Sequence, residues 1–296
     1  MTVCIAALAA KSKAIVCIAD RKLTYPGYGG NSESDSAILK IVDLPGNWCA
    51  LFSCQSLTFP KRVLDDVIAK LSGRDDVTLA GMESTVKKAF ETCWWDEIED
   101  HILKPILLTR ADFAQRSTNV HPLDRNLVIK LAKEMSEYKQ VCSIIFCGFE
   151  GDTPHIFVAS APVDIDPSDW EGFAIVGDGL EAARNQMLWN SYDKDDSLAG
   201  VLYEVFNAKV ATEVLQTIGY EWNWRILVPG KKPEPLPGNV DKAIDRLWIE
   251  HNLSPFSPKS RIKPGQIEEW KKEVRSFCEK ALSPASIKRS NSRKSK

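Results

Sequence analysis

The sequence predicts an α+β protein, because short strand-like runs and longer helical runs both recur along it. Two runs rich in β-branched residues, 3–9 and 14–19, flank a polar break and predict a β-hairpin. A second pair, 141–149 and 154–161, predicts another hairpin around Gly151. Residues 60–71 and 82–103 instead place apolar residues at helical spacing. At 296 residues the chain can form one large domain or two ordinary ones.

Composition and charge exclude several classes of protein. The formal net charge of -2 gives no indication of a nucleic-acid or membrane partner. No apolar run approaches the ~20 residues of a membrane helix, and no basic segment precedes the N-terminal apolar run as in a signal peptide. The four His show no ligand spacing, and Cys142 and Cys147 point to opposite faces of one strand. We therefore expect a cytoplasmic protein with no cofactor or metal and with buried, reduced cysteines.

The first strand places Thr2 at the end of a buried element. A threonine at a mature N-terminus carries a hydroxyl that can attack a carbonyl and an amine that can accept the proton. An α-amine has a typical pKa of about 7.7–8.0, so part of it is neutral near pH 7. Because Thr2 is small, we expect ordinary removal of Met1, with no propeptide required.

Several short segments in a fixed order carry a family resemblance. Thr2 opens the first strand, Asp20-Arg21 ends the second, and Lys40-Ile41 begins a third. Together with the central hairpin and the turn Gly177-Asp178-Gly179, this order resembles bacterial proteasome-like β-type subunits, which are N-terminal nucleophile hydrolases. The similarity weakens after the first third and ends near Gly230. It implies a four-layer α/β/β/α sandwich of two stacked antiparallel sheets and a ring or helical homo-oligomer.

The resemblance also implies roles for three residues. Thr2 is the nucleophile, Lys40 lies beside its hydroxyl, and Asp20 holds Lys40. Each has an ordinary structural alternative. Lys40 could extend from a sheet edge into solvent, and Asp20 could cap the loop that follows its strand.

The chain departs from the family pattern at three places. Ser53 stands where the family has a glycine whose backbone N–H forms the oxyanion hole; a backbone donor does not require glycine, but a side chain crowds the cleft. Asp178 replaces a serine between two glycines, where it either caps the following helix or contacts the Thr2 amine. The family's Asp-x-x-Ser-Gly set is absent from residues 217–221.

The remaining segments predict the domain organisation. Residues 23–36 predict a long Gly-rich loop that either lines a substrate cleft or subunit contact or is a solvated excursion. Residues 1–230 form the hydrolase domain, with a helical insertion near 94–122 whose Trp94-Trp95 pair we interpret as packing. Residues 231–284 predict a Pro-rich linker and a helical extension, and 285–296 a disordered basic tail, for which a nucleic-acid role is a weak alternative.

Three functions are compatible with these features. The first is a threonine hydrolase that cleaves peptide amide bonds after Met1 removal. The second is a non-proteolytic amide hydrolase of the same fold. The third is a catalytically silent subunit for assembly or binding. The departures favour the silent subunit, whereas the intact set of Thr2, Asp20 and Lys40 favours an enzyme.

Overall fold

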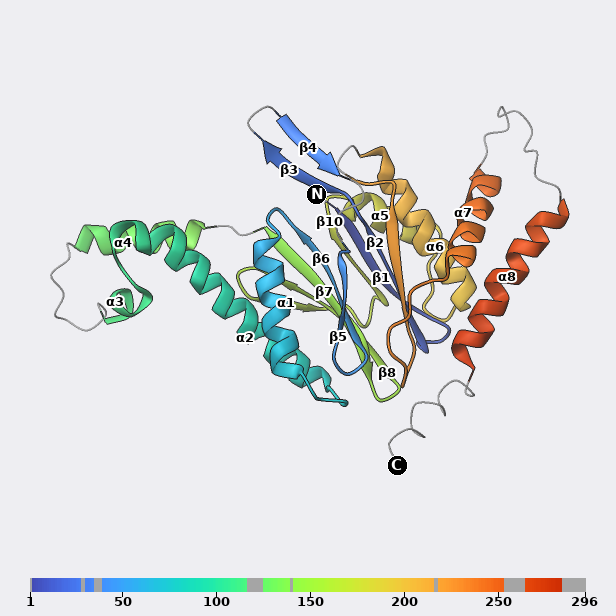
Figure 1. Cartoon of the computed structure of the whole chain (residues 1–296), viewed down its shortest axis with the longest axis horizontal. Helices are drawn as coiled ribbons and strands as arrows, with labels where there is room; N and C mark the ends of the chain where they lie inside the picture. Colours follow the sequence, from blue (N-terminus) through green and yellow to red (C-terminus); the bar gives the residue numbers. More distant parts are fainter. Residues whose placement is uncertain are drawn as a thin grey trace.

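Two stacked antiparallel sheets with helices on both outer sides make up the body of the protein (Figure 1). The computed structural model describes residues 2–27, 30–34, 39–115, 125–138, 141–215, 218–252 and 264–283. The first sheet has the order β10-β1-β2-β11, formed by Phe173–Gly177, Val3–Ala9, Ala14–Asp20 and Trp222–Leu227. The second has the order β5-β6-β7-β8-β9, formed by Ile41–Leu44, Trp48–Cys54, Cys142–Glu150, Thr153–Ser160 and Asp164–Pro167. The predicted four-layer sandwich is confirmed.

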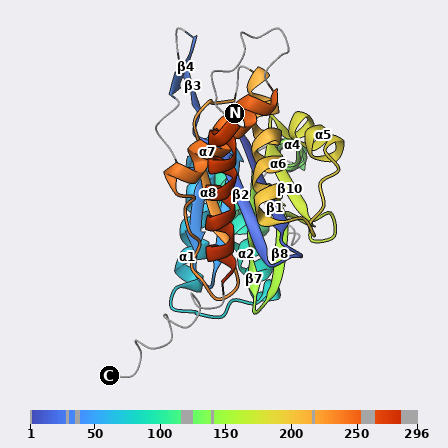
Figure 2. The ribbon, with the colours of Figure 1, turned by 90° about the vertical axis from the view of Figure 1, so that its right-hand side faces the viewer.

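Helices cover each sheet on its outer side. The second sheet is covered by α1 (Thr58–Leu71) and α2 (Leu79–Ile98), and the first by α5 (Leu180–Trp189) and α6 (Leu198–Ala211). Outside α6 lie α7 (Gly238–Asn252) and α8 (Pro264–Leu282), which Figure 2 shows in front of β1 and β2. A π-turn (Glu99–Leu103), a 3-10 turn (Lys104–Ile106), α3 (Arg110–Gln115) and α4 (Arg125–Glu137) extend away from the sheets (Figure 1).

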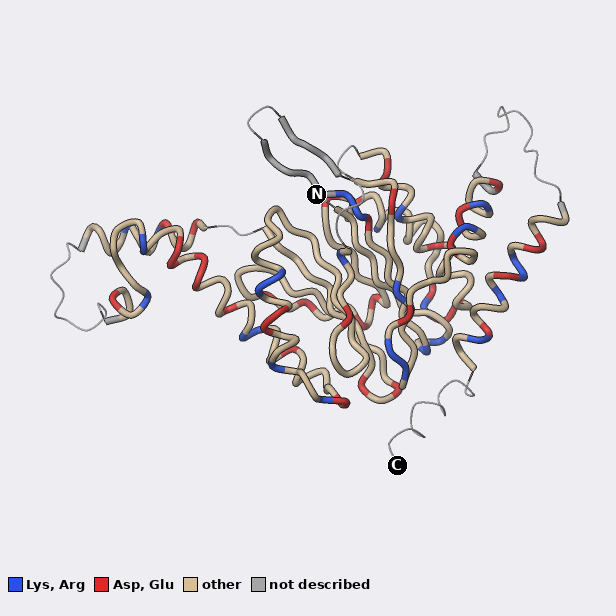
Figure 3. Tube along the Cα trace, viewed as in Figure 1, with Lys and Arg blue, Asp and Glu red and all other residues tan. Residues whose placement is uncertain are grey.

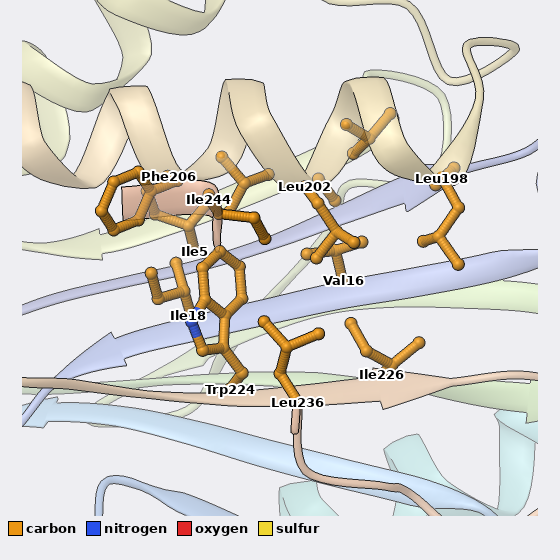
Figure 4. Close-up of a cluster of buried hydrophobic side chains, with 14 of the residues drawn as sticks. Ile5, Val16, Ile18, Leu198, Leu202, Phe206, Trp224, Ile226, Leu236 and Ile244 are labelled. Carbon is orange, nitrogen blue, oxygen red and sulfur yellow. The ribbon is translucent and has the colours of Figure 1, made fainter. Parts of the chain in front are cut away.

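One large core lies between the first sheet and its helices. Alternate residues of β1 and β2, among them Ile5, Val16 and Ile18, point toward Leu202 and Phe206 of α6 (Figure 4). An apolar stripe of α8 joins this core: Trp270 and Val274 are buried, and Ile267 and Phe277 pack against it. The C-terminal helices, predicted as a helical extension, therefore dock on their own chain.

The layer between the two sheets is the core that supports the site. It contains Leu51 and Ile145 of the second sheet and Cys17 of the first. Cys147 also lies in this layer, with its Sγ 3.4 Å from that of Cys17, while Cys142 faces the helices on the other side. The expected opposite orientation of the two strand cysteines is confirmed.

Charged side chains gather on the helices and at the ends of strands, and the strand interiors are nearly free of them (Figure 3). This distribution is the one that the cost of burying an unpaired charge requires. In the part of the chain that the structure describes, no helix combines the length and the apolarity that crossing a bilayer demands.

Two segments differ from the sequence-based expectation. Residues 23–34 were predicted as loop, but the described backbone pairs as β3 (Leu23–Gly27) and β4 (Gly30–Ser34), with Gly27 opposite Gly30. No strand was predicted for β9, a four-residue edge strand that ends in Pro167, a residue that is tolerated at sheet edges. Residues 35–36, 116–122, 217 and 285–296, on which other expectations fell, lie outside the described residues.

The insertion begins with the paired tryptophans at the end of α2. Their rings lie 5.2 Å apart, edge to face, and Trp94 packs against the core under α1 and α2. The guanidinium of Arg110 lies 4.4 Å from the ring centre of Trp95. Both rings therefore act as packing surfaces, in agreement with the interpretation from sequence.

Candidate active site

Three elements bring Thr2, Asp20 and Lys40 together at one end of the sandwich. Antiparallel pairing of β1 with β2, with Cys4 opposite Ala19, places the start of β1 beside the last residue of β2. Lys40 immediately precedes β5, the edge strand of the second sheet. All three side chains are almost fully removed from solvent, with exposed fractions of 2%, 0% and 3% for Thr2, Asp20 and Lys40.

The three polar groups form one hydrogen-bonded network. The Lys40 ammonium donates to Thr2 Oγ1 and to Asp20 Oδ1, the latter at 3.0 Å. The Thr2 hydroxyl in turn donates to Asp20 Oδ1. The alternative of a lysine that reaches into solvent is therefore wrong. A buried ammonium is tolerated here because a carboxylate pairs with it, and removal of either partner would leave a costly unpaired charge.

Asp20 is held by backbone donors as well as by Lys40. Its Oδ1 accepts from the N–H of Val3 at 2.9 Å, and its Oδ2 accepts from the N–H groups of Lys22 and Gly219 at 3.2 Å. The bond to Lys22, two residues on, is the loop-capping contact proposed as the structural alternative. Asp20 thus caps the turn and binds Lys40 at the same time. These bonds come from three separate segments and fix the carboxylate toward Thr2.

Gly219 and Lys209 are site-supporting residues that sequence reasoning missed. The Lys209 side chain is fully buried, and its ammonium donates to the carbonyl of Gly219 at 3.0 Å and to Glu213. It also lies 4.4 Å from the ring centre of Trp222. Lys209 therefore anchors the residue whose N–H supports Asp20. A lysine within the apolar run of α6 was the available sequence signal. Residues 217–221 lack the Asp-x-x-Ser-Gly set, but the backbone N–H of Gly219 in this segment donates to Asp20.

Ser53 and Asp178 lie next to this network but outside it. Ser53, near the end of β6, is half-buried, and its Oγ lies 3.2 Å from the position that a Cβ on Gly177 would occupy. Asp178 is exposed, and among the described residues its carboxylate has no hydrogen-bond partner. The helix cap is Gly179 with no side-chain hydrogen bond, so the capping role predicted for Asp178 is wrong. Contact with a free Thr2 amine stays a prediction.

The thiols of Cys4 and Cys54, which lie near the network, have raised pKa values. Burial raises the pKa of the Cys54 thiol to about 11, and nearby Lys40 lowers it only in part. Burial also raises the pKa of the Cys4 thiol well above its ordinary value. Since the thiolate is the reactive form, both cysteines are weak nucleophiles near neutral pH.

The sequence matches no protein-family model and no curated protein. Solved structures do match by fold. The ancestral β-subunit Anbu from Yersinia bercovieri superimposes with a TM-score of 0.58 at 10% identity. A Gly-1 mutant of Anbu from Hyphomicrobium sp. strain MC1 gives a TM-score of 0.55 at 12% identity. Each comparison covers 89% of this chain and all of the other. The fold of an ancestral β-subunit is thus present, and it is the fold that the resemblance to proteasome β-type subunits implied.

Gly177 lies opposite Val3 and leaves no room for a side chain beside the Thr2 backbone. Its φ is +107°, and an added Cβ would lie 2.0 Å from the Thr2 carbonyl oxygen. Gly177→Ala should therefore destabilise the protein by roughly 1–3 kcal/mol from overpacking, in addition to backbone strain. Gly73→Ala is the matched control, because Gly73 also has positive φ, +78°, but nothing lies within 4 Å of its Cβ position. Equal losses of unfolding free energy in denaturant would contradict the steric explanation.

Proposed function

We propose that this chain is a cytoplasmic, proteasome-like threonine hydrolase that cleaves peptide amide bonds once Met1 has been removed. The observation that carries the proposal is the buried network in which one threonine hydroxyl bonds to both a lysine and an aspartate. An ammonium 3.0 Å from a carboxylate is an ordinary structural pair. A threonine hydroxyl that links the two, at the start of a strand, is the arrangement of an activated nucleophile.

In the proposed reaction, the Thr2 oxygen attacks the carbonyl carbon of the amide and its proton passes to the free Thr2 amine. The tetrahedral intermediate collapses, the C–N bond breaks, and the leaving amine takes that proton. Water then attacks the resulting ester and regenerates the hydroxyl. Lys40 stabilises negative charge that develops on the Thr2 oxygen, and Asp20 keeps Lys40 in position. A backbone N–H near Ser53 would serve as the oxyanion donor.

The silent subunit remains the second candidate, and two observations favour it. Thr2 is 2% exposed, so little of its surface is open to a substrate. The side chain of Ser53, which replaces a glycine of the family pattern, occupies space beside Gly177. Under either candidate we propose that several chains assemble into a ring or helical homo-oligomer, as the resemblance implies.

The test is covalent labelling of the purified full chain with two electrophiles, a β-lactone and a peptide epoxyketone. The β-lactone needs the hydroxyl, whereas the epoxyketone needs the hydroxyl and the free amine. We expect intact-mass analysis to show loss of Met1 and one adduct per chain from each reagent, with peptide mapping to Thr2. Native mass spectrometry of the same sample counts the chains in the assembly. Complete retention of Met1, or no adduct on chains that lack it, would leave the silent subunit as the function.

A further inference from the structure

A cavity of about 690 Å³ lies near the candidate nucleophile, because Gly177 in its lining is opposite Val3, although Thr2 itself is not among the described residues that line it. It starts at Ser53 and Gly177 and opens between the edges of the two sheets. One wall is β10, the edge strand of the first sheet, and the other is the inner face of the second sheet as far as β9. Its volume falls within the range of ligand-binding sites, about 300–1,000 Å³. The cavity is therefore large enough to hold part of a substrate near Thr2.

A continuous row of polar residues crosses the wall that the second sheet forms. The strand register places Ser53 opposite Ser143, Ser143 opposite Ser160, and Ser160 opposite Asp164. Residues directly opposite on neighbouring strands are side-chain neighbours, and the Oγ atoms of Ser143 and Ser160 lie 2.9 Å apart. Two positions deeper, the same face is apolar, with Leu51 and Ile145. Along the strands, the inner face therefore changes from apolar core residues to serine hydroxyls. Across the strands, the row of serines ends in the carboxylate of Asp164 on the edge strand.

The charges around the cavity do not balance. Among the described residues that line it, there are four carboxylates, those of Asp164, Asp166, Glu171 and Asp178, and one cation, Arg184. Arg184 is already paired with Glu171 at 3.1 Å. Among the described residues, the other three carboxylates have neither an ion pair nor a hydrogen bond. Exposed carboxylates are negatively charged at neutral pH, so the cavity attracts positive charge.

Two further side chains of the cavity, those of Ser168 and Trp170, can contact a ligand. Ser168 is only 8% exposed and lines the cavity, yet its hydroxyl has no hydrogen-bond partner among the described residues. Its hydroxyl is not among the enclosed polar atoms that lack a partner, so it is the part of this side chain that a ligand in the cavity can still reach. Trp170 also lines the cavity and is 80% exposed. An exposed indole beside carboxylates is a favourable contact for a guanidinium or ammonium group.

We propose that this cavity binds the basic, extended part of a peptide substrate. That the bound peptide is a substrate rests on the proposed function; that the cavity binds a basic peptide does not. Three strand spacings of about 4.8 Å separate Ser53 from Asp164, roughly 14 Å in total. An extended peptide advances about 3.4 Å per residue, and a long basic side chain shortens the required distance. The preferred lysine or arginine therefore lies about two to four residues from the bond that is cleaved.

Binding is tested on Thr2→Ala protein, so that no chemistry intervenes. Three fluorescein-labelled peptides of one sequence carry two arginines, two glutamines or two glutamates at these positions, and fluorescence anisotropy gives the dissociation constants. The arginine peptide should bind about five- to thirtyfold more tightly than the glutamine peptide, as expected for two exposed ion pairs. The double variant Asp164→Asn with Asp166→Asn should remove this preference. Added salt should weaken only the arginine peptide.

The matched control removes two carboxylates elsewhere. Asp75 and Asp76 are exposed in the connection between α1 and α2 and do not line the cavity, so Asp75→Asn with Asp76→Asn should leave the preference unchanged. Equal affinities for the three peptides, equal loss in both double variants, or no binding of any peptide would overturn the inference. These outcomes are distinct from failure of the hydrolase, which is read from electrophile labelling of the unsubstituted chain.

Discussion

Thr2→Ala is expected to abolish both electrophile labelling and amide hydrolysis, a loss of roughly a thousandfold or more, because it removes the attacking oxygen. The fold should persist, since Lys40 and Asp20 remain paired at 3.0 Å and Asp20 keeps its three backbone donors. Thr2→Ser is the matched control because it retains a hydroxyl and an amine. It should label at the same site. Rates of adduct formation, measured by intact mass on folded protein, decide the result.

Labelling that survives in Thr2→Ala would contradict the assignment of the nucleophile. Cys54 is then the first residue to examine, because it is half-buried and the positive charge of nearby Lys40 favours its thiolate. With a pKa raised to about 11, however, its thiolate is scarce at neutral pH and increases tenfold with each pH unit. Adduct formation through Cys54 should therefore rise steeply between pH 7 and pH 9 and disappear in Cys54→Ser.

Lys40→Met is expected to slow labelling of Thr2 by about ten- to a hundredfold, which corresponds to ~1.4–2.7 kcal/mol in activation free energy. Methionine fills similar space but removes the ammonium that donates to Thr2 Oγ1. It also leaves the buried Asp20 without its cation, which costs stability. Labelling should therefore be measured well below the unfolding temperature of the variant, with folded protein verified at that temperature.

The control for this variant is Lys231→Met. Lys231 donates to the carbonyl of Ala281 at the end of α8, so its removal also deletes an internal ammonium contact but leaves Thr2 untouched. Its labelling rate should match that of the unsubstituted chain. If Lys40→Met labels as fast as Lys231→Met, Lys40 is a structural ion-pair partner and has no effect on the nucleophile.

The local pattern of the chain determined most of the architecture. Both faces of β1 and β2 are buried, as their continuous apolar runs predicted. The hairpin around Gly151 and the helices α1 and α2 lie where the sequence pattern placed them. The exceptions were segments whose structure depends on partners. β9 is an edge strand of four residues, and β3 and β4 are rich in residues that usually indicate turns.

The sequence by itself determined which side chains could form the site. Thr2 and Asp20 stand at the ends of predicted strands and Lys40 at the start of another, and their hydroxyl, carboxylate and ammonium groups are evident from residue type alone. It also fixed Ser53 and Asp178 at two positions where the family differs. Only the tertiary structure decided that Lys40 is buried, that Gly219 donates to Asp20, and that Lys209 anchors Gly219. The row from Ser53 to Asp164 likewise exists only through the register of four strands. These contacts join residues far apart in sequence, up to 199 positions for Gly219 and Asp20, and their distances depend on packing that no local pattern encodes.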